Sequence, residues 1–475
     1  MINSISLIEL QQQFGGKLIN GDTCFQRLVI DSRQVQANDL FVAIKGERFD
    51  SHQFIPQVIA SGAGALVVSQ PQDSPLPQWL VPDTQIALGQ IAQFNRQRFK
   101  GPTVAITGNS GKTTVKEMLG CILSLSGQPL ITQGNFNNEI GVPLTLLRLE
   151  QKHTSAIIEL GANHLGEIAY TTELAQPDIG VVMNVTGAHL GEFGSIANIA
   201  QAKGELIEGL PKKGLAVINA DDAFAGDWCK LAGDRSVVLY GIHSRESSFS
   251  RKYPLVYAED LKIAETGYGF TLYLPESKSE LSTAVDAGVE VGAESRVKVQ
   301  LNVPAKHNVS NALAAASAAY ALGIQAEQIA SGLALFSGVS GRLQVIKGLG
   351  GATVLNDSYN ANPGSVRAAI DTLMDFNGKT YLVLGDIGEL GDSSLSAHAE
   401  LGRYAKQAGV DQLYTVGDFS EQATHSFGVG AIHWPDQQSL IDALKQQLQV
   451  NTTVLVKGSR SAAMEFVAEQ LKFTQ

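Results

Sequence analysis

Short apolar stretches separated by polar turns occupy the first 82 residues, and their spacing predicts a small α/β unit. The stretches at residues 27–33, 39–46 and 64–69 have the length of strands. Residues 52–63 space their apolar positions as a helix does. Prolines cluster within residues 71–83, which predicts a linker or surface loop at the end of this unit.

From residue 83 onward, strand-like and helix-like segments alternate. Residues 86–99 and 113–127 have helical patterns, and the strand-like residues 102–107 lie between them, followed by a glycine-rich turn. Further apolar strands, each preceded by a helical stretch, occur at residues 155–160, 178–185 and 215–220. Such alternation is typical of a mostly parallel sheet with helices on both faces.

A second alternating series begins near residue 335. Residues 245–303 are strand-like and rich in turns, and an alanine-rich helix is predicted at residues 308–323. The later strands are predicted at residues 352–357, 380–386, 412–417 and 453–458. They indicate a smaller, doubly wound, Rossmann-like fold. A chain of 475 residues is long enough for about three domains at roughly 150 residues each. We therefore predict an α/β protein with domains at residues 1–82, 83–332 and 333–475.

Composition and charge narrow the class of protein. Hydrophobic residues make up 44% and charged residues 17%, as in a globular protein. The net charge of -11 disfavours non-specific nucleic-acid binding, so any bound phosphate needs a local pocket. The chain has three widely spaced cysteines, and its first segment is unlike a signal peptide. It has no apolar run of about 20 residues. We therefore predict a cytoplasmic protein without an integral membrane segment.

The strongest motif is TGNSGKTT, which comprises Thr107, Gly108, Asn109, Ser110, Gly111, Lys112, Thr113 and Thr114. Its glycines allow the backbone to curl so that N–H groups point at phosphate oxygens, and the following helix N-terminus adds a favourable dipole. Lys112 could then reach the terminal phosphates and the Thr113 hydroxyl could ligate Mg²⁺. Ile106 stands where the general phosphate-loop pattern has its first glycine. The alternative is an ordinary glycine-rich turn with a solvated lysine.

Three residues further along are candidates for a magnesium site. Glu159 ends an apolar strand, so its carboxylate is expected at the same sheet edge as the loop. His189 follows another strand and could ligate a second metal or bind phosphate, although a lone histidine is as often structural. Lys203 by itself reads as a solvated helix residue, and Glu159 could equally be a strand-end acid in water.

The order of these motifs resembles the Mur ligase superfamily across nearly the whole chain, including its shortened TGxxGKT loop. The resemblance implies that Glu159 and His189 bind magnesium, with two metal sites, and that Lys203 is carbamylated to support the metal. It also implies catalytic roles for Lys112, His189 and Lys203. The segment HNVSNALAAASAA resembles the family helix whose asparagines contact ATP, and SGRLQ and NDSYNANPGS match its third domain. The residues that carry these ATP contacts are Asn308, Asn311, Arg342 and Asp357.

Four further segments resemble the branch of the family that adds D-alanyl-D-alanine. They are GNFNNEIGVPLTLL, DSYNANP, VLGDIGELG and LVKGSRSAAME, and we find no DNPR-type motif of the neighbouring branch. The N-terminal DSR resembles a UDP-sugar-binding domain, which implies substrate contacts by Asp31, Ser32 and Arg33. Asn360 and Arg460 are candidates for the acceptor site. The implied partners are UDP-N-acetylmuramoyl-tripeptide and D-alanyl-D-alanine, and we expect a monomer.

The resemblance implies an ATP-dependent ligase that works through an acyl phosphate. Lys112, magnesium and the shell formed by Glu159, His189 and carbamylated Lys203 would neutralise the charge that accumulates during phosphoryl transfer. Other readings are another ligase of the superfamily, such as a folate ligase that adds glutamate, and a phosphate-loop ATPase switch without a peptide product. A UDP-sugar-binding module with an inactive nucleotide site is the third.

Overall fold

The computed structural model describes residues 1–46, 49–186, 190–243, 252–264, 267–275 and 295–473. The chain forms two compact units. The first contains Met1–Tyr257 and Leu313–Ile329, and the second contains Ala258–Tyr273, Arg296–Ala312 and Ala330–Gln475. The fold is α/β with mostly parallel sheets, as the sequence predicts. Among the described helices, none is long and apolar enough to cross a membrane.

The N-terminal part of the first unit is built on a five-stranded sheet of order β2-β7-β6-β5-β4. The strand bounds are Lys17–Ile19 for β2, Leu28–Val29 for β4, Leu40–Val42 for β5, Ala65–Val68 for β6 and Gln78–Leu80 for β7. A separate antiparallel pair joins β1 (Ile5–Ser6) to β3 (Cys24–Phe25). The first predicted strands are therefore present as β4, β5 and β6.

Strand β7 corrects the sequence prediction of a linker or surface loop at residues 71–83. It pairs in parallel with β6 and antiparallel with β2. Trp79 is fully buried, and its indole Nε1 donates a hydrogen bond of 2.9 Å to the carbonyl of Gly15. The prolines flank the strand without entering it, so its three backbone N–H groups are free to pair with the neighbouring strands.

Helices of this region start at side chains that cap them. Helix α1 (Leu7–Phe14) begins with a capping box between Ser6 and Glu9. The helix predicted at residues 52–63 is a 3₁₀ turn at Ser51–Phe54 followed by α2 (Ile55–Ala60). Asp50 caps the 3₁₀ turn by accepting a hydrogen bond from the backbone of His52.

The second part of the first unit is a parallel sheet that positions the predicted nucleotide loop. Its strands are β8 (Thr103–Thr107), β9 (Pro129–Ile131), β10 (Ser155–Glu159), β11 (Ile179–Val182), β12 (Leu215–Asn219) and β13 (Ser236–Gly241). Their spatial order is β13-β12-β11-β8-β10-β9, and β14 (Leu255–Ala264) pairs in parallel with β13 through residues 255–257. The rest of β14, and almost all of β15 (Gly267–Leu274) and β16 (Ser295–Leu301), belong to the second unit. The chain places β9 and β10 on one side of β8 and β11 on the other. The strand order therefore reverses at β8, which is where ligands bind in open α/β sheets.

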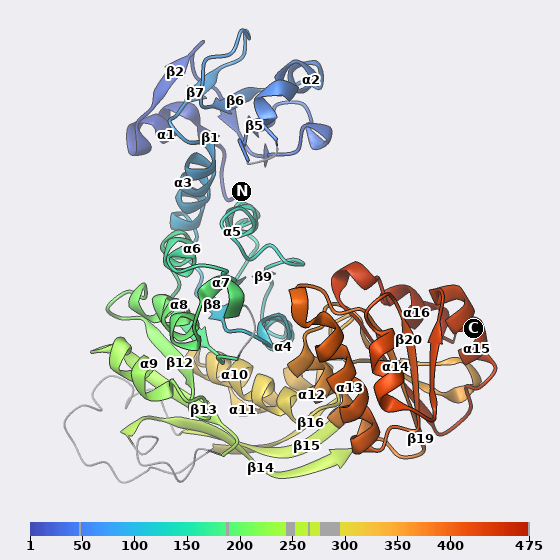
Figure 1. The fold of residues 1–475 in the computed structure, drawn as a ribbon. Helices are drawn as coiled ribbons and strands as arrows, with labels where there is room; N and C mark the ends of the chain where they lie inside the picture. The colour runs from blue at the N-terminus through green and yellow to red at the C-terminus, as the bar shows by residue number, and fades with distance from the viewer. Residues whose placement is uncertain (47–48, 187–189, 244–251, 265–266, 276–294, 474–475) are drawn as a thin grey trace. The chain divides into compact units, whose positions relative to one another are not determined.

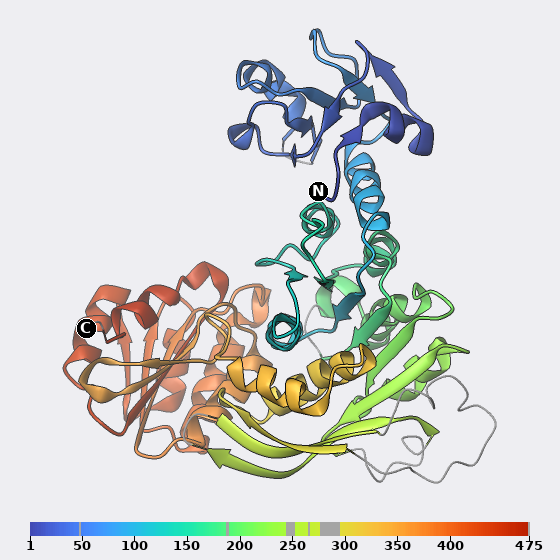
Figure 2. The ribbon, with the colours of Figure 1, turned by 180° about the vertical axis from the view of Figure 1, so that it is seen from behind.

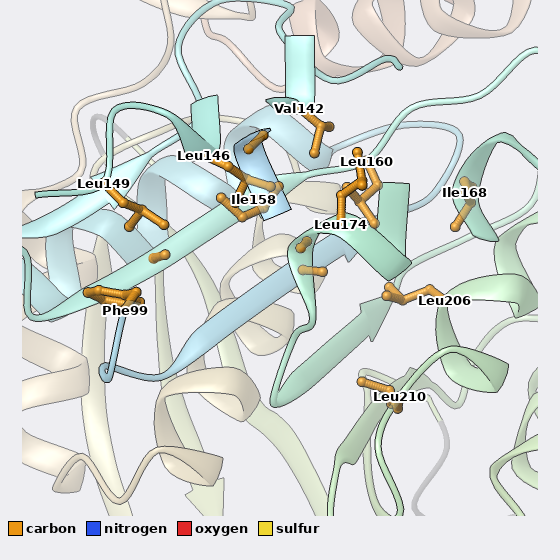
Figure 3. Close-up of a cluster of buried hydrophobic side chains, with 14 of the residues drawn as sticks. Phe99, Val142, Leu146, Leu149, Ile158, Leu160, Ile168, Leu174, Leu206 and Leu210 are labelled. Atoms are coloured by element: carbon orange, nitrogen blue, oxygen red, sulfur yellow. The ribbon is translucent and has the colours of Figure 1, made fainter. Parts of the chain in front are cut away.

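Helices pack on this sheet, and most of them contribute to one apolar core with its strands. They are α3 (Thr84–Gln97), α4 (Lys112–Ser124), α5 (Gly141–Leu146), α6 (Glu167–Ala175), α7 (Leu190–Phe193), α8 (Ile196–Glu208) and α9 (Ala225–Ala232). The long helix α3 runs between the blue N-terminal strands and the central sheet in both views (Figures 1 and 2). Figure 3 shows part of the core, where Ile158 of β10 lies near Leu146 of α5. Ile158 is the residue before Glu159, so this packing holds the carboxylate-bearing strand end in place.

The second unit is centred on a six-stranded sheet of order β17-β18-β22-β19-β20-β21. Its strands are β17 (Gln344–Lys347), β18 (Thr353–Asp357), β19 (Lys379–Gly385), β20 (Gln412–Val416), β21 (Ala431–Trp434) and β22 (Thr452–Lys457), and only β17 pairs antiparallel. Helices α10 (His307–Ala321) and α11 (Ala326–Leu335) precede it in the chain.

Helices lie on both faces of this sheet, so its strands alternate between two cores. Helices α12 (Pro363–Met374), α13 (Ser394–Ala408) and α14 (Glu421–Phe427) belong to one core, and α15 (Gln437–Lys445) and α16 (Glu465–Gln470) to the other. Leu455 of β22 packs in the first core, whereas Val454 and Val456 pack in the second. This period of two, with both faces buried, is the doubly wound arrangement predicted from the sequence.

Replacing Ile158 by alanine should lower the free energy of unfolding of the first unit by about 2–5 kcal/mol, because the side chain is fully buried and its removal leaves a cavity. Urea unfolding followed by circular dichroism, with hydrogen exchange of the β8 and β10 amides, measures the change. Ile86→Ala is the matched control, because Ile86 of α3 is 52% exposed and should cost under about 1 kcal/mol. Equal effects of the two substitutions would contradict this account of the core.

Candidate functional site

The glycine-rich turn lies between β8 and α4, which is the predicted strand–turn–helix arrangement. Gly108 has φ +155° and Gly111 has φ +82°. A Cβ atom on Gly108 would come within 2.8 Å of the Cβ of Met183, which follows β11. The close approach of two chain segments thus requires glycine at position 108, and the left-handed conformation favours it at position 111.

Lys112 is the first residue of α4, and its ammonium group lies over the turn. Its Nζ donates hydrogen bonds to the carbonyl oxygens of Gly108 at 2.6 Å and Asn109 at 3.3 Å. A positive charge therefore sits next to backbone N–H groups at the N-terminus of a 13-residue helix. This combination favours the binding of an anion.

Asn184, which the sequence analysis did not identify, holds the turn from the neighbouring strand. Its Oδ1 accepts a hydrogen bond of 3.0 Å from the backbone of Ser110, and its Nδ2 donates one of 3.1 Å to the Ser110 carbonyl. The Asn184 carbonyl accepts a third bond from the backbone of Asn109 at 3.0 Å. A polar residue directly after an apolar strand was the available sequence signal.

Glu159 stands at the end of β10 and is aimed at the start of α4. Its register partner on β8 is Ile106, so its carboxylate lies at the level of the turn. The carboxylate is buried, and it accepts hydrogen bonds from the Thr113 hydroxyl at 3.0 Å and from Asn137 Nδ2 at 2.8 Å. A carboxylate beside a hydroxyl offers the hard oxygen ligands that Mg²⁺ prefers, with phosphate and water to complete its shell. These residues therefore fit a magnesium ion.

The other predicted magnesium ligands are His189 and Lys203. Within the described residues, no group of three or more His, Cys, Asp and Glu side chains is arranged to hold a metal ion. His189 lies outside the residues that the structure describes, so its predicted role is neither supported nor opposed by geometry. Lys203 belongs to the same unit as the turn and Glu159.

Lys203 lies on α8 and is almost completely buried, with 2% of its surface exposed. Its Nζ is 5.7 Å from the centre of the Phe193 ring. Burial, and then the positive charge of Lys112, lower the pKa of Lys203 to about 7. The nearby Glu205 opposes this shift only partly, since its carboxylate also accepts hydrogen bonds from the α6 backbone at Gly166 and Ala169. A substantial share of the Lys203 amine is therefore neutral near pH 7. The sequence motif by itself indicated a solvated helix residue at this position instead.

In the second unit, Asp357 and Lys457 form a buried ion pair at the ends of adjacent parallel strands. Lys457 Nζ lies 2.5 Å from Asp357 Oδ2 and donates a second bond of 3.0 Å to the Asn360 carbonyl. The other Asp357 oxygen accepts a bond of 3.1 Å from the backbone of Leu343. Lys457 fixes the carboxylate of Asp357, which the family resemblance assigns to ATP binding. The lysine itself was not among the residues predicted from the sequence.

Two predicted anion-binding arginines of the second unit lie over the same aromatic ring. The guanidinium carbon of Arg342 is 4.4 Å from the centre of the Tyr359 ring, and that of Arg460 is 6.0 Å away. Arg460 is 68% exposed and pairs with Glu465 at 3.1 Å. Asn360, the other acceptor candidate, is exposed on the same chain segment as Tyr359. Arg342 and Arg460 are therefore neighbours around Tyr359, and Asn360 follows that residue in the chain.

Asn308 and Asn311 lie one turn apart on α10, and both are buried. Asn311 Nδ2 donates to Asn308 Oδ1 at 2.9 Å, and Asn308 Nδ2 donates to the Pro304 carbonyl at 2.6 Å. Their side-chain amides are thus held by each other and by the preceding turn.

The N-terminal candidates Asp31, Ser32 and Arg33 lie on the surface beside β4. Asp31 caps the 3₁₀ turn that begins at Ser32, and it forms a bidentate ion pair with Arg33 at 2.7 and 2.9 Å. Hydrogen bonds from the Arg33 side chain and backbone lower the pKa of Asp31 to about 2. The Arg33 guanidinium is 82% exposed and available to a ligand on its outer side.

Comparison with known protein families gives three matches in chain order. Residues 25–96 match the catalytic domain of the Mur ligase family, residues 106–319 match the Mur ligase middle domain, and residues 341–460 match the Mur ligase glutamate ligase domain. The matches include the nucleotide turn, Glu159 and the Asp357–Lys457 pair.

Individual relatives are similar over nearly their full length. The chain is 42% identical to UDP-N-acetylmuramoyl-tripeptide--D-alanyl-D-alanine ligase of Escherichia coli, over 99% of this chain and 98% of the relative. A crystal structure of MurF from Acinetobacter baumannii matches with a TM-score of 0.86 and 36% identity over 99% of each chain. The MurF ligase of Thermotoga maritima in complex with ADP matches with a TM-score of 0.78 and 28% identity, over 94% of this chain and 96% of that one.

Replacing Asn184 by alanine should weaken the binding of ATP about tenfold, because the turn loses three side-chain hydrogen bonds worth about 1–2 kcal/mol together. Isothermal titration with ATP measures the affinity. Asn3→Ala is the control, since Asn3 is exposed and its side chain only accepts a bond from Gln151. Unchanged ATP affinity in Asn184→Ala would show that the turn keeps its shape without this residue.

Proposed function

The chain belongs to the Mur ligase family, and from this membership we propose that it joins D-alanyl-D-alanine to UDP-N-acetylmuramoyl-tripeptide in an ATP-dependent reaction. The product would be the UDP-linked pentapeptide precursor of peptidoglycan. The observation that carries the proposal is the turn at residues 107–114 with Lys112 over it and the buried Glu159 beside Thr113, in a chain 42% identical to a ligase of that name.

The reaction must first activate a carboxylate, because its oxygen is a poor leaving group. In the proposed first step a carboxylate oxygen of the tripeptide attacks the γ-phosphorus of ATP, and the bond between that phosphorus and the bridging oxygen of ADP breaks. In the second step the neutral amine of D-alanyl-D-alanine attacks the acyl carbon, inorganic phosphate leaves, and the amine nitrogen loses its proton. The protein contributes mainly position and charge in such a sequence.

Lys112 is the residue that we propose to neutralise the transferred phosphoryl group. Its ammonium already lies over the turn, so it needs little reorganisation to contact an anion bound there. Backbone N–H groups of the turn and the α4 N-terminus would hold the other phosphates. Asn184 keeps the turn in the shape that these contacts need.

The metal requirement is proposed from Glu159 and Thr113. Magnesium, when bound, would neutralise phosphate charge and orient the γ-phosphoryl group. Glu159 and the Thr113 hydroxyl would hold one ion, and His189 with a carbamylated Lys203 would support a second. A buried amine with a pKa near 7 suits carbamylation, since only the neutral amine attacks CO₂ and the resulting carbamate presents anionic oxygens.

Three further groups of residues are proposed to contact the UDP-sugar, ATP and the acceptor. Asp31, Ser32 and Arg33 would bind the UDP-sugar, Asn308, Asn311, Arg342 and Asp357 would bind ATP, and Asn360 and Arg460 would bind the acceptor. We propose functional domains at residues 1–82, 83–332 and 333–475, corresponding to these three ligands, in a monomeric cytoplasmic enzyme. The exposed guanidinium groups of Arg33 and Arg460 are suited to anionic groups of the substrates.

Release of inorganic phosphate should require ATP, UDP-N-acetylmuramoyl-tripeptide and D-alanyl-D-alanine together. With ¹⁸O in the tripeptide carboxylate, mass spectrometry should find the label in the released phosphate, because the carboxylate oxygen that attacked phosphorus leaves with it. Lys112→Ala should reduce turnover roughly a thousandfold or more, since a phosphate-neutralising charge is lost from a preorganised site. Phosphate release without any acceptor would favour an ATPase switch instead.

Lys203→Ala should be inactive and regain part of its activity when short carboxylates such as acetate are added, because these can replace the carbamate oxygens. Steady-state assays with and without acetate measure the rescue. Lys230→Ala is the control, since Lys230 is 80% exposed and only pairs with Asp227.

A pH measurement tests the same assignment through the wild-type protein. After CO₂ is removed, recovery of activity at one fixed concentration of dissolved CO₂ should be slower at pH 6 than at pH 8. Below a pKa of about 7 the Lys203 amine is mostly protonated and cannot attack CO₂. Full activity of Lys203→Ala without acetate would remove Lys203 from the mechanism.

A further inference from the structure

Lys116 is a buried lysine that neither the sequence motif nor the proposed mechanism uses. It lies four residues after Lys112 on α4, so the two side chains leave the same face of the helix. Only 1% of Lys116 is exposed, which places it among the largest fully buried side chains of the protein. Burying an ammonium group is costly unless charges and hydrogen bonds compensate it, so its surroundings need a specific explanation.

The Lys116 ammonium has three oxygen partners. It donates a hydrogen bond of 2.6 Å to the carbonyl of Thr132, which directly follows β9. It lies 3.1 Å from the Glu117 carboxylate, which is 39% exposed, and 3.9 Å from Oε2 of the buried Glu159. The Glu117 contact is partly screened by water, whereas the contact with Glu159 is between two side chains that are each at most 3% exposed.

Thr132 links Lys116 to Glu159 a second time. Its hydroxyl accepts a hydrogen bond of 3.0 Å from the backbone N–H of Glu159, while its carbonyl binds Lys116. Lys116 therefore contacts the residue that fixes the Glu159 backbone and also faces the Glu159 carboxylate. The Thr113 hydroxyl donates a hydrogen bond of 3.0 Å to the same carboxylate oxygen, Oε2 of Glu159. If the Thr113 hydroxyl turns to a metal ion, Lys116 still faces this oxygen.

We propose that Lys116 is a positioning residue that holds the Glu159 carboxylate ready for the divalent cation bound with the nucleotide. It acts on Glu159 from within the protein and contacts neither nucleotide nor substrate. The inference rests on the proposed function only in assigning a metal-nucleotide complex to this site. It can be tested by binding alone, without the ligation reaction.

The test compares the Mn²⁺ affinities of the full-length wild type and its variants in the presence of ADP. Electron paramagnetic resonance of Mn²⁺ measures each affinity. Lys116→Gln removes the charge but keeps a donor for the Thr132 carbonyl. It should weaken Mn²⁺ binding about tenfold, as expected when a group that orients a metal ligand is lost. Its affinity for ADP in EDTA should stay within about twofold of the wild type, because the turn is untouched. Glu117→Gln is the matched control and should change Mn²⁺ affinity less than about twofold, since that carboxylate is partly exposed.

A double substitution separates positioning from a general role in folding. In the Glu159→Gln background, Lys116→Gln should weaken Mn²⁺ binding by less than about twofold, because the charge on which it acts has gone. Unchanged Mn²⁺ affinity in Lys116→Gln, or an equal loss with and without Glu159, would overturn the proposal. Failure of both Lys116→Gln and Lys116→Met to fold would assign Lys116 to folding alone and overturn it as well. If the wild type binds Mn²⁺ and ADP but does not ligate D-alanyl-D-alanine, only the proposed function fails.

Discussion

The close approach of β8 and β11 at the reversal of strand order is the constraint on which the site depends. The turn after β8 passes so near Met183 that residue 108 cannot carry a side chain. That contact brings Asn184 within hydrogen-bonding distance of the turn and places β10 with Glu159 on its other side. The same geometry therefore supplies an anion-binding turn, a support for it and a carboxylate next to it.

Positive charge around this turn is concentrated although the chain carries a net charge of -11. Lys112 lies over the turn, and its charge contributes to the low pKa of Lys203. Lys116 is buried behind Glu159. Lys112 is the charge placed where an anion would bind, so it favours a phosphate group at the turn. Local charge, rather than the charge of the whole protein, determines the ligand that this site suits.

The second unit prepares its candidate residues in a comparable way. The Lys457 ammonium fixes Asp357 from an adjacent parallel strand, and Tyr359 lies against the guanidinium groups of Arg342 and Arg460. Each candidate is thus held by a partner from a different part of the chain. Preorganisation of this kind reduces the entropy lost when a ligand binds.

The sequence by itself determined the α/β class, the parallel sheets, the nucleotide turn and the strand-end position of Glu159. These features depend on short periodicities and on local motifs, which neighbouring residues specify. It did not predict β7, because proline clusters usually mark loops and only the pairing with β2 and β6 makes residues 78–80 a strand. Asn184, Lys116 and Lys457 were missed because their partners lie 16 to 100 residues away along the chain. Only the tertiary structure brings such residues together, since a contact between distant segments leaves no local pattern in either one.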